Sequence, residues 1–215
     1  MTLWGDFLTN DERTIHKWKH YFPAYERHFS RYVYRPLVFW EIGCGRGGSL
    51  QMWKRYFGPH AQIVGLDIRP ECSELQEDQI AVRIGNQSQA SFLDRVLQEF
   101  GVPDIVLDDG SHKMDQVIAT FRHMYPRLDR NGVYLVEDVH TAYWEQYGGG
   151  LRRTGTFIEL CKELIDELNG VHAGIASEFT HSTLSMHFYD SIVAFERGRH
   201  GTRKALKTPD PKRNG

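Results

Sequence analysis

A turn rich in glycine joins an apolar run to an amphipathic stretch at residues 39–49 (FWEIGCGRGGS). Glycine is needed where the backbone turns tightly or comes close to a ligand, because a Cβ would clash there. A strand, a turn of this kind and a helix are how α/β proteins hold a nucleotide or nucleoside at a helix N-terminus. The segment therefore predicts an α/β fold with a nucleoside-binding loop.

The glycines of this loop fit two patterns. Gly43, Gly45 and Gly48 satisfy GxGxxG, the dinucleotide fingerprint, which is a weak signal by itself. Glu41, Gly43, Gly45 and Gly47 satisfy ExGxGxG, which resembles the first motif of class I S-adenosylmethionine-dependent methyltransferases. The loop alone leaves both an NAD-dependent dehydrogenase and a methyltransferase open.

The rest of the chain alternates strand and helix patterns. Such repeats predict a doubly wound, mostly parallel, seven-stranded Rossmann-like sheet with helices on both faces. Residues 175–179 and 184–195 are expected to form a C-terminal antiparallel strand pair. The other strands are expected at 37–42, 62–68, 80–84, 104–107 and 133–136, and the helices at 49–57, 89–100, 112–124 and 155–168.

The N-terminal region carries apolar and aromatic residues at helical spacing. This pattern predicts a helix over 9–35, in which Pro23 starts a second helix or kinks the first. We expect residues 1–36 to form a helical cap on a core at 37–197.

Length and composition limit the remaining possibilities. We expect one methyltransferase-like domain over 1–197 and a basic, disordered tail over 198–215. The net charge of −2 gives no reason to expect nucleic acid as a partner, and no apolar run is long enough to span a membrane. Three cysteines without a CxxC pair indicate a reducing, cytoplasmic setting.

Polar residues follow the ends of the next two expected strands. Asp67 comes 19 positions after Gly48, where an acid can accept hydrogen bonds from ribose hydroxyls. The turn Gly85-Asn86-Gln87 follows the short strand at 80–84. Ligands bind at the carboxyl ends of strands in open α/β sheets, so both positions are candidates for cofactor contacts.

Two acidic pairs follow the later strands, Asp108-Asp109 and Glu137-Asp138. Because these strands should be neighbours, three or four carboxylates meet in a small space, which is unfavourable without a cation or proton uptake. Hard carboxylate oxygens suit Mg²⁺, which keeps open positions for substrate oxygens. The alternative is a set of solvated or arginine-paired acids.

His112 follows Asp109 by three positions, at the expected start of a helix that Ser111 can cap. A helix N-terminus disfavours the imidazolium, so a neutral base would be available beside the metal. Asp109, His112 and His140 can also be combined into a site with two histidines and one carboxylate, which is typical of iron oxygenases.

The motifs LDDGSH (107–112) and VEDVHTAYW (136–144) resemble the metal-dependent sugar O-methyltransferases of macrolide biosynthesis, which include the macrocin and mycinamicin enzymes and related rhamnosyl O-methyltransferases. The resemblance implies that Asp109, Glu137 and Asp138 bind Mg²⁺ and that His112 is the general base. It also implies that S-adenosylmethionine contacts Glu41, Gly43, Gly45, Gly47, Ser49, Asp67, Asn86, Gln87 and Asp108.

The resemblance further implies a sugar or oligosaccharide hydroxyl as the methyl acceptor, with His140, Tyr143 and Trp144 on the acceptor side. The chain departs from the family in its short length, and it has Asn86 where an acid is common. A homo-oligomer, most simply a dimer, is expected.

Four other functions are alternatives to this hypothesis. A catechol or other phenol can replace the sugar, since vicinal oxygens would chelate Mg²⁺ equally well. An Fe(II)-dependent hydroxylase would have no need of the nucleoside loop, and a dehydrogenase leaves the acidic motifs unexplained. A non-catalytic binding protein would keep four carboxylates together at a cost in stability without a return in function.

Overall fold

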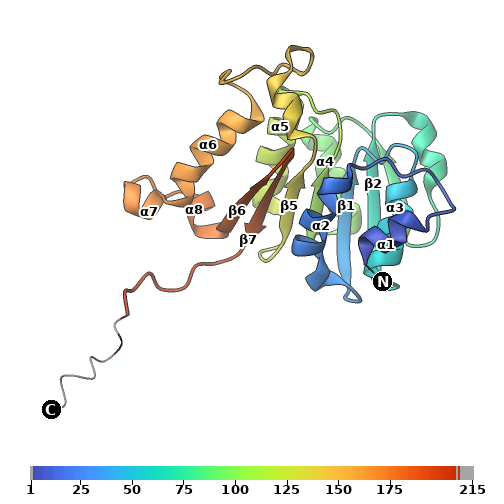
Figure 1. Cartoon of the computed structure of the whole chain (residues 1–215), viewed down its shortest axis with the longest axis horizontal. Helices are drawn as coiled ribbons and strands as arrows, with labels where there is room; N and C mark the ends of the chain where they lie inside the picture. Colours follow the sequence, from blue (N-terminus) through green and yellow to red (C-terminus); the bar gives the residue numbers. More distant parts are fainter. Residues whose placement is uncertain (1, 207, 209–215) are drawn as a thin grey trace.

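Seven strands form a single sheet in the computed structural model, which describes residues 2–206 and 208 (Figure 1). The strand order is β3-β2-β1-β4-β5-β7-β6, and β7 alone runs opposite to the other six strands. This arrangement confirms the predicted doubly wound sheet with an antiparallel C-terminal pair. The strands are β1 (Leu37–Ile42), β2 (Ala61–Asp67), β3 (Ile80–Ile84), β4 (Ile105–Asp108), β5 (Val133–Val136), β6 (Thr183–Tyr189) and β7 (Ile192–Arg197).

Helices cover both faces of the sheet. One face packs on α1, α2 and α3, and the other packs on α4, α5 and α6. Successive residues of a strand therefore enter different cores, as Phe39 and Trp40 do, which explains why β1 is apolar on both faces except at Glu41. The helices are α1 (Leu3–Leu8), α2 (Phe22–Phe29), α3 (Gly48–Phe57), α4 (Ala90–Phe100), α5 (Met114–Met124), α6 (Phe157–Leu168), α7 (Gly170–Ala173) and α8 (Glu178–Ser182).

The bounds of the C-terminal pair differ from the prediction. The segment 175–179 is not a strand, because Ser177 caps α8 and accepts a hydrogen bond from the backbone N–H of Thr180. The expected strand 184–195 is instead a hairpin of β6 and β7, with Ser191 at φ 64° in its turn. The sequence does not reveal the turn at residues 190–191, because the turn contains no glycine.

The predicted N-terminal helix is wrong over its first half. Residues 13–18 form neither helix nor strand, and Arg13, Ile15 and Lys17 are less exposed than the residues that alternate with them. We call residues 13–18 the strap. It crosses the start of α3, where a Cβ on Gly48 would lie 2.3 Å from the carbonyl oxygen of Thr14. The helical pattern resumes at α2, which begins beside Pro23 as predicted.

A polar contact ties α2 to the C-terminal hairpin. The buried imidazole of His28 lies with Nδ1 2.6 Å from Oε1 of Glu196 on β7 and with Nε2 2.9 Å from the hydroxyl of Tyr189 on β6. Arg31 donates to the other carboxylate oxygen at 2.8 Å. The hydrogen bond from His28, aided by Arg31, lowers the pKa of Glu196 to about 2.

Replacing Glu196 with glutamine tests this contact. Because the folded-state pKa is depressed from 4.5, the carboxylate stabilises the fold above pH 4.5, and this contribution is lost as the pH falls toward 2. The variant should be about 1–2 kcal/mol less stable than the parent at pH 7, a value reduced by partial exposure. Urea denaturation should show a smaller difference at pH 3.5 than at pH 7, and an equal difference at both pH values would contradict the assignment.

The basic tail lies at the end of β7. Residues 198–206 and 208 form neither helix nor strand and lead away from the sheet (Figure 1). Residues 207 and 209–215 lie outside the described part of the chain, so the predicted disorder of the tail stays a prediction. None of the described helices is long and apolar enough to cross a membrane.

Candidate active site

The glycine loop brings the ends of β1 and β4 into contact. Gly43 has φ 85°, and a Cβ there would lie 2.1 Å from the carbonyl oxygen of Asp109. Only glycine allows both the left-handed conformation and this close approach. Gly47, at φ 79°, then starts α3.

A first cavity of about 290 Å³ opens where β1, β2 and β3 end. Its walls combine the glycine loop with the segments that follow β2 and β3, as expected for a nucleoside pocket at the carboxyl edge of the sheet. The predicted cofactor residues that line it are Gly43, Gly45, Asp67, Asn86 and Gln87.

Asp67 is already engaged by a neighbouring cation. The Arg69 guanidinium donates to both of its carboxylate oxygens, at 3.1 and 3.2 Å, and also donates to the carbonyl of Gly45 at 2.8 Å. Although burial opposes it, these hydrogen bonds lower the pKa of Asp67. Both Asp67 and the half-exposed Arg69 line the cavity, so a ribose held there would meet this ion pair.

Two other predicted cofactor residues lie beneath the cavities. Asp108 is buried, and it accepts hydrogen bonds from Gln87 at 3.0 Å and Tyr134 at 3.2 Å. Burial raises its pKa to about 7. Glu41 is fully buried and accepts a hydrogen bond from Ser49 at 2.7 Å. Both carboxylates therefore support the loop from below rather than line the first cavity.

A second cavity of about 750 Å³ adjoins the first. The two share Gly43, Gly45 and Asp109, so a group held in one cavity can reach a group held in the other at this boundary. Of the other predicted site residues, the second cavity is lined by Ser49, His112, Glu137, Asp138, His140 and Trp144.

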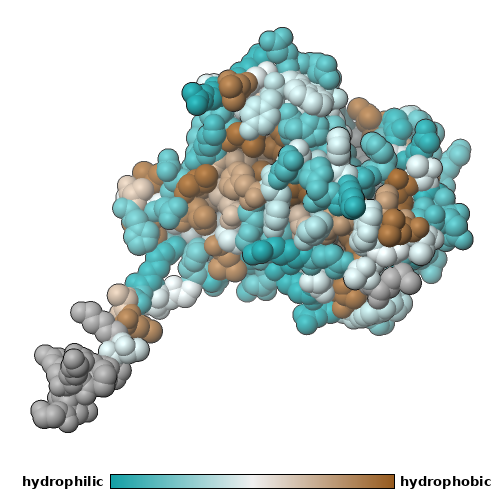
Figure 2. Space-filling model, in the orientation of Figure 1, coloured by the Kyte–Doolittle hydropathy of each residue, from teal (hydrophilic) through white to brown (hydrophobic). Residues whose placement is uncertain are grey.

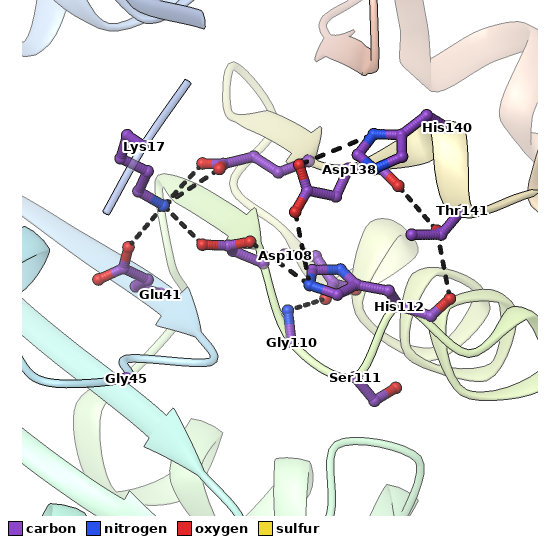
Figure 3. A network of polar contacts seen from close by, with 12 residues as sticks. Lys17, Glu41, Gly45, Asp108, Gly110, Ser111, His112, Asp138, His140 and Thr141 are labelled. Atoms are coloured by element: carbon purple, nitrogen blue, oxygen red, sulfur yellow. Dashed lines mark hydrogen bonds and ion pairs between the residues drawn. The ribbon is translucent and has the colours of Figure 1, made fainter. Parts of the chain in front are cut away.

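The ammonium of Lys17 lies among the acidic residues (Figure 3). It is 2.7 Å from Asp109 Oδ2, 2.9 Å from Glu137 Oε1 and 3.2 Å from Glu41 Oε1. Burial disfavours the charged form, but the three carboxylates raise the pKa of Lys17 well above its ordinary value. The acidic cluster that the sequence predicted thus has a cation supplied by the strap.

A second part of the cluster faces the cavity. Nε2 of His112 lies 3.8 Å from Asp109 Oδ1 and 3.7 Å from Asp138 Oδ2, and one ligand atom from each of the three residues lies within 4.8 Å of the others. Tyr21 donates a hydrogen bond of 2.5 Å to Asp138 Oδ1. Two carboxylate oxygens and an imidazole are therefore directed at one small space (Figure 3).

The backbone holds two of these residues in uncommon conformations. His112 has φ 56° and Asp138 has φ 52°, both in the left-handed region. His112 thus precedes α5, which begins at Met114 after Lys113, and it is not in the first turn of the helix as expected. Strained positions of this kind persist where the surroundings enforce them, often at functional sites.

The iron site considered from the sequence is not assembled among the described residues. Nδ1 of His140 lies 3.0 Å from the hydroxyl of Ser191 and 4.0 Å from Asp138. The group that can share a metal contains one histidine and two carboxylates, rather than two histidines and one carboxylate. This arrangement disfavours the hydroxylase hypothesis.

Aromatic rings line one side of the second cavity. His140 is 4.7 Å from Trp144 and 6.2 Å from Trp18, and Trp144 is 6.1 Å from Tyr147, between ring centroids. Tyr143 is half exposed and does not line the cavity. Trp18 and Tyr147 also line this cavity, and the sequence did not mark either of them as a site residue.

Comparisons with known proteins agree with this geometry. The chain is 37% identical over 199 residues to mycinamicin VI 2''-O-methyltransferase of Micromonospora griseorubida, covering 84% of this chain and 49% of that protein. It is also 37% identical over 201 residues to the 8-demethyl-8-(2-methoxy-alpha-L-rhamnosyl)-tetracenomycin-C 3'-O-methyltransferase of Streptomyces olivaceus, covering 85% and 50%. No protein-family model matches the chain.

A solved structure gives the same result. The MycE methyltransferase of the mycinamycin biosynthetic pathway, solved with Mg, SAH and mycinamycin VI, superposes with a TM-score of 0.78 at 35% identity, over 92% of this chain and 53% of that chain. The chain spans about half the length of the curated relatives it matches. It is thus a relative of the sugar O-methyltransferases, as its acidic motifs predicted, and has the class I methyltransferase fold.

Proposed function

We propose that this chain transfers the methyl group of S-adenosylmethionine to a hydroxyl of a sugar, with Mg²⁺ at the acidic cluster. The observation that carries the proposal is the boundary between the two cavities. Gly43, Gly45 and Asp109 line both, and His112 lies beside Asp109 on the acceptor side. A methyl donor in the first cavity would therefore meet an acceptor, a base and a metal in one place.

The first cavity fits the nucleoside of S-adenosylmethionine. Gly43 and Gly45 have left-handed φ values, so the backbone can approach a ligand without a Cβ in the way. The carboxylate of Asp67 lines this cavity as a candidate partner of the ribose hydroxyls, and Asn86 and Gln87 line it as well. The related MycE enzyme was solved with SAH, which supports the same cofactor here.

The acidic cluster fits Mg²⁺ by its donor set. Asp109 Oδ1 and Asp138 Oδ2 are hard oxygens at the cavity surface, and they leave most positions of an octahedral ion to water or substrate. Glu137 meets Lys17 with both oxygens, so its predicted part in metal binding stays a prediction. Bound Mg²⁺ would lower the pKa of an acceptor hydroxyl and orient it.

His112 is proposed as the general base. Its Nε2 is directed at the space between Asp109 and Asp138, within reach of a hydroxyl held there. Two carboxylates lie on this side of the ring, at 3.8 and 3.7 Å from Nε2. Deprotonation of the acceptor hydroxyl would thus have a nearby proton acceptor. Tyr21 holds Asp138 in place by a hydrogen bond.

The acceptor class follows from the second cavity and the relatives. Trp18 and Trp144 offer flat apolar surfaces beside polar groups, which suits the two sides of a sugar ring. By their names, one relative methylates mycinamicin VI and the other a rhamnosyl tetracenomycin. We propose a glycoside with neighbouring hydroxyls as the acceptor, and a catechol as the second candidate because the same chelation would serve it.

An acceptor assay tests this function. Purified protein should transfer one methyl group from S-adenosylmethionine to rhamnosides in the presence of Mg²⁺, and transfer should stop with EDTA and return with added Mg²⁺. Catechol serves as the competing acceptor in parallel reactions. Methylation of catechol but of no glycoside would show that the acceptor is a catechol and not a sugar. Methyl transfer that EDTA does not affect would contradict the proposed role of Mg²⁺.

The assembly and setting of the protein stay predictions. Leu184 and Phe188 are exposed on the edge strand β6, and apolar side chains gather on this side of the molecule (Figure 2). An edge strand with apolar side chains supports the expected homo-oligomer. We propose a dimer in the cytoplasm, with residues 1–197 acting as one domain.

A further inference from the structure

We propose that Lys17 is a positioning residue: a built-in cation that neutralises one half of the acidic cluster and leaves the other half free for a divalent metal. This inference rests on the proposed function for the role of the metal. Its structural part, that the ammonium holds the carboxylates together, stands on the contacts alone.

The burial of Lys17 is the first observation. Its side chain is 2% exposed, and its ammonium contacts carboxylates from the ends of β1, β4 and β5. A lysine is rarely buried unless it is paired, because desolvating its charge is costly. Three carboxylate partners within 3.2 Å offset that cost, so the buried ammonium is stabilised at this position.

The division of the cluster is the second observation. Glu41 and both oxygens of Glu137 face the ammonium, whereas Asp138 faces His112. Asp109 joins the two halves, because its Oδ2 accepts from Lys17 and its Oδ1 is directed toward His112. Lys17 thereby fixes which oxygen of Asp109 is presented to the cavity.

The charge balance gives the consequence. Three carboxyl groups contact the ammonium and Asp138 lies beside them, so the cluster holds more acidic groups than cations, and a divalent ion can bind the acidic oxygens that Lys17 does not contact. Without Lys17, the three carboxylates, two of them buried, would lose their cation. The folded protein would then depend on the metal for neutralisation, and Mg²⁺ would stabilise it more than it stabilises the parent.

Thermal unfolding of the Lys17→Met and Lys17→Arg variants tests the proposal. In EDTA, Lys17→Met should unfold on the order of 10 °C below the parent, as expected for breaking a buried ion pair in a domain of this size. Addition of MgCl₂ should raise its Tm by more than it raises that of the parent. Lys17→Arg, which keeps the charge, should retain most of the parent's Tm in EDTA and a parent-like response to Mg²⁺.

A compensating variant keeps the test informative if Lys17→Met does not fold. Lys17→Met/Glu137→Gln removes one positive and one negative charge together, so it should recover part of the lost Tm in EDTA. Lys162→Met is the control, since Lys162 pairs with Glu159 on the exposed face of α6 and its loss should leave Tm unchanged.

Two results would overturn the proposal. One is a Lys17→Met variant with the parent's Tm in EDTA, and the other is a lowered Tm with no increase in the response to Mg²⁺. Binding of S-adenosylhomocysteine (SAH) in EDTA separates this failure from failure of the proposed function, because Lys17 does not line the first cavity. SAH binding with either result would reject the role of Lys17 and leave methyl transfer standing.

Discussion

Replacing His112 with asparagine should lower kcat for methyl transfer by about 10²–10⁴-fold, the contribution of a well-placed general base. Asparagine is the better substitution because it tolerates the left-handed backbone at φ 56°, whereas alanine would add strain there. The sugar hydroxyl would then have no imidazole at this position of the cavity surface to take its proton. Single-turnover rates with saturating S-adenosylmethionine and Mg²⁺ measure the loss.

SAH affinity distinguishes this role from a structural one. His112 does not line the first cavity, so His112→Asn should bind SAH nearly as tightly as the parent. His172→Asn is a matched control, since this histidine is exposed on α7. Equal losses of SAH affinity and kcat in the His112 variant would show that the side chain supports the fold rather than the reaction.

Replacing Asp138 with asparagine should weaken Mg²⁺ binding by at least 10–100-fold, roughly the effect of losing a residue that only supports a metal ligand. The substitution keeps the shape of the side chain and tolerates φ 52°, while it removes one of the two carboxylates at the cavity surface. Calorimetric titration of Mg²⁺ measures the affinity directly and does not depend on turnover.

Glu145→Gln is the control for this titration, because Glu145 is an exposed acid in the segment after β5 and should not affect the metal. An Asp138→Asn variant that binds Mg²⁺ like the parent would place the ion elsewhere in the cluster. Binding lost in the Glu145 variant as well would indicate a general effect of surface charge.

The sequence predicted the parts of the site that follow from the sheet. Asp109 and Asp138 follow the ends of neighbouring parallel strands, and the carboxyl ends of such strands meet at one edge. The spacing of the motifs was therefore enough to bring these two acids and His112 together. The glycine loop was equally readable, because close backbone approach demands glycine.

Contacts between distant segments could not be predicted in the same way. The apolar spacing of Ile15, Trp18 and Phe22 fits a helix, but the strap lies over Gly48 without forming one, and its Lys17 is buried among the acids. Local patterns do not contain this tertiary override. Likewise, nothing in the sequence around Asp67 shows that Arg69 folds back onto it.

The central claim is that the glycine loop holds S-adenosylmethionine, and calorimetric titration of SAH tests it most directly. SAH should bind with micromolar affinity in the presence and absence of Mg²⁺, and NAD⁺ should give no signal under the same conditions. Binding of NAD⁺ without SAH would contradict the account, since the loop would then serve a dinucleotide and the acidic cluster would need another explanation.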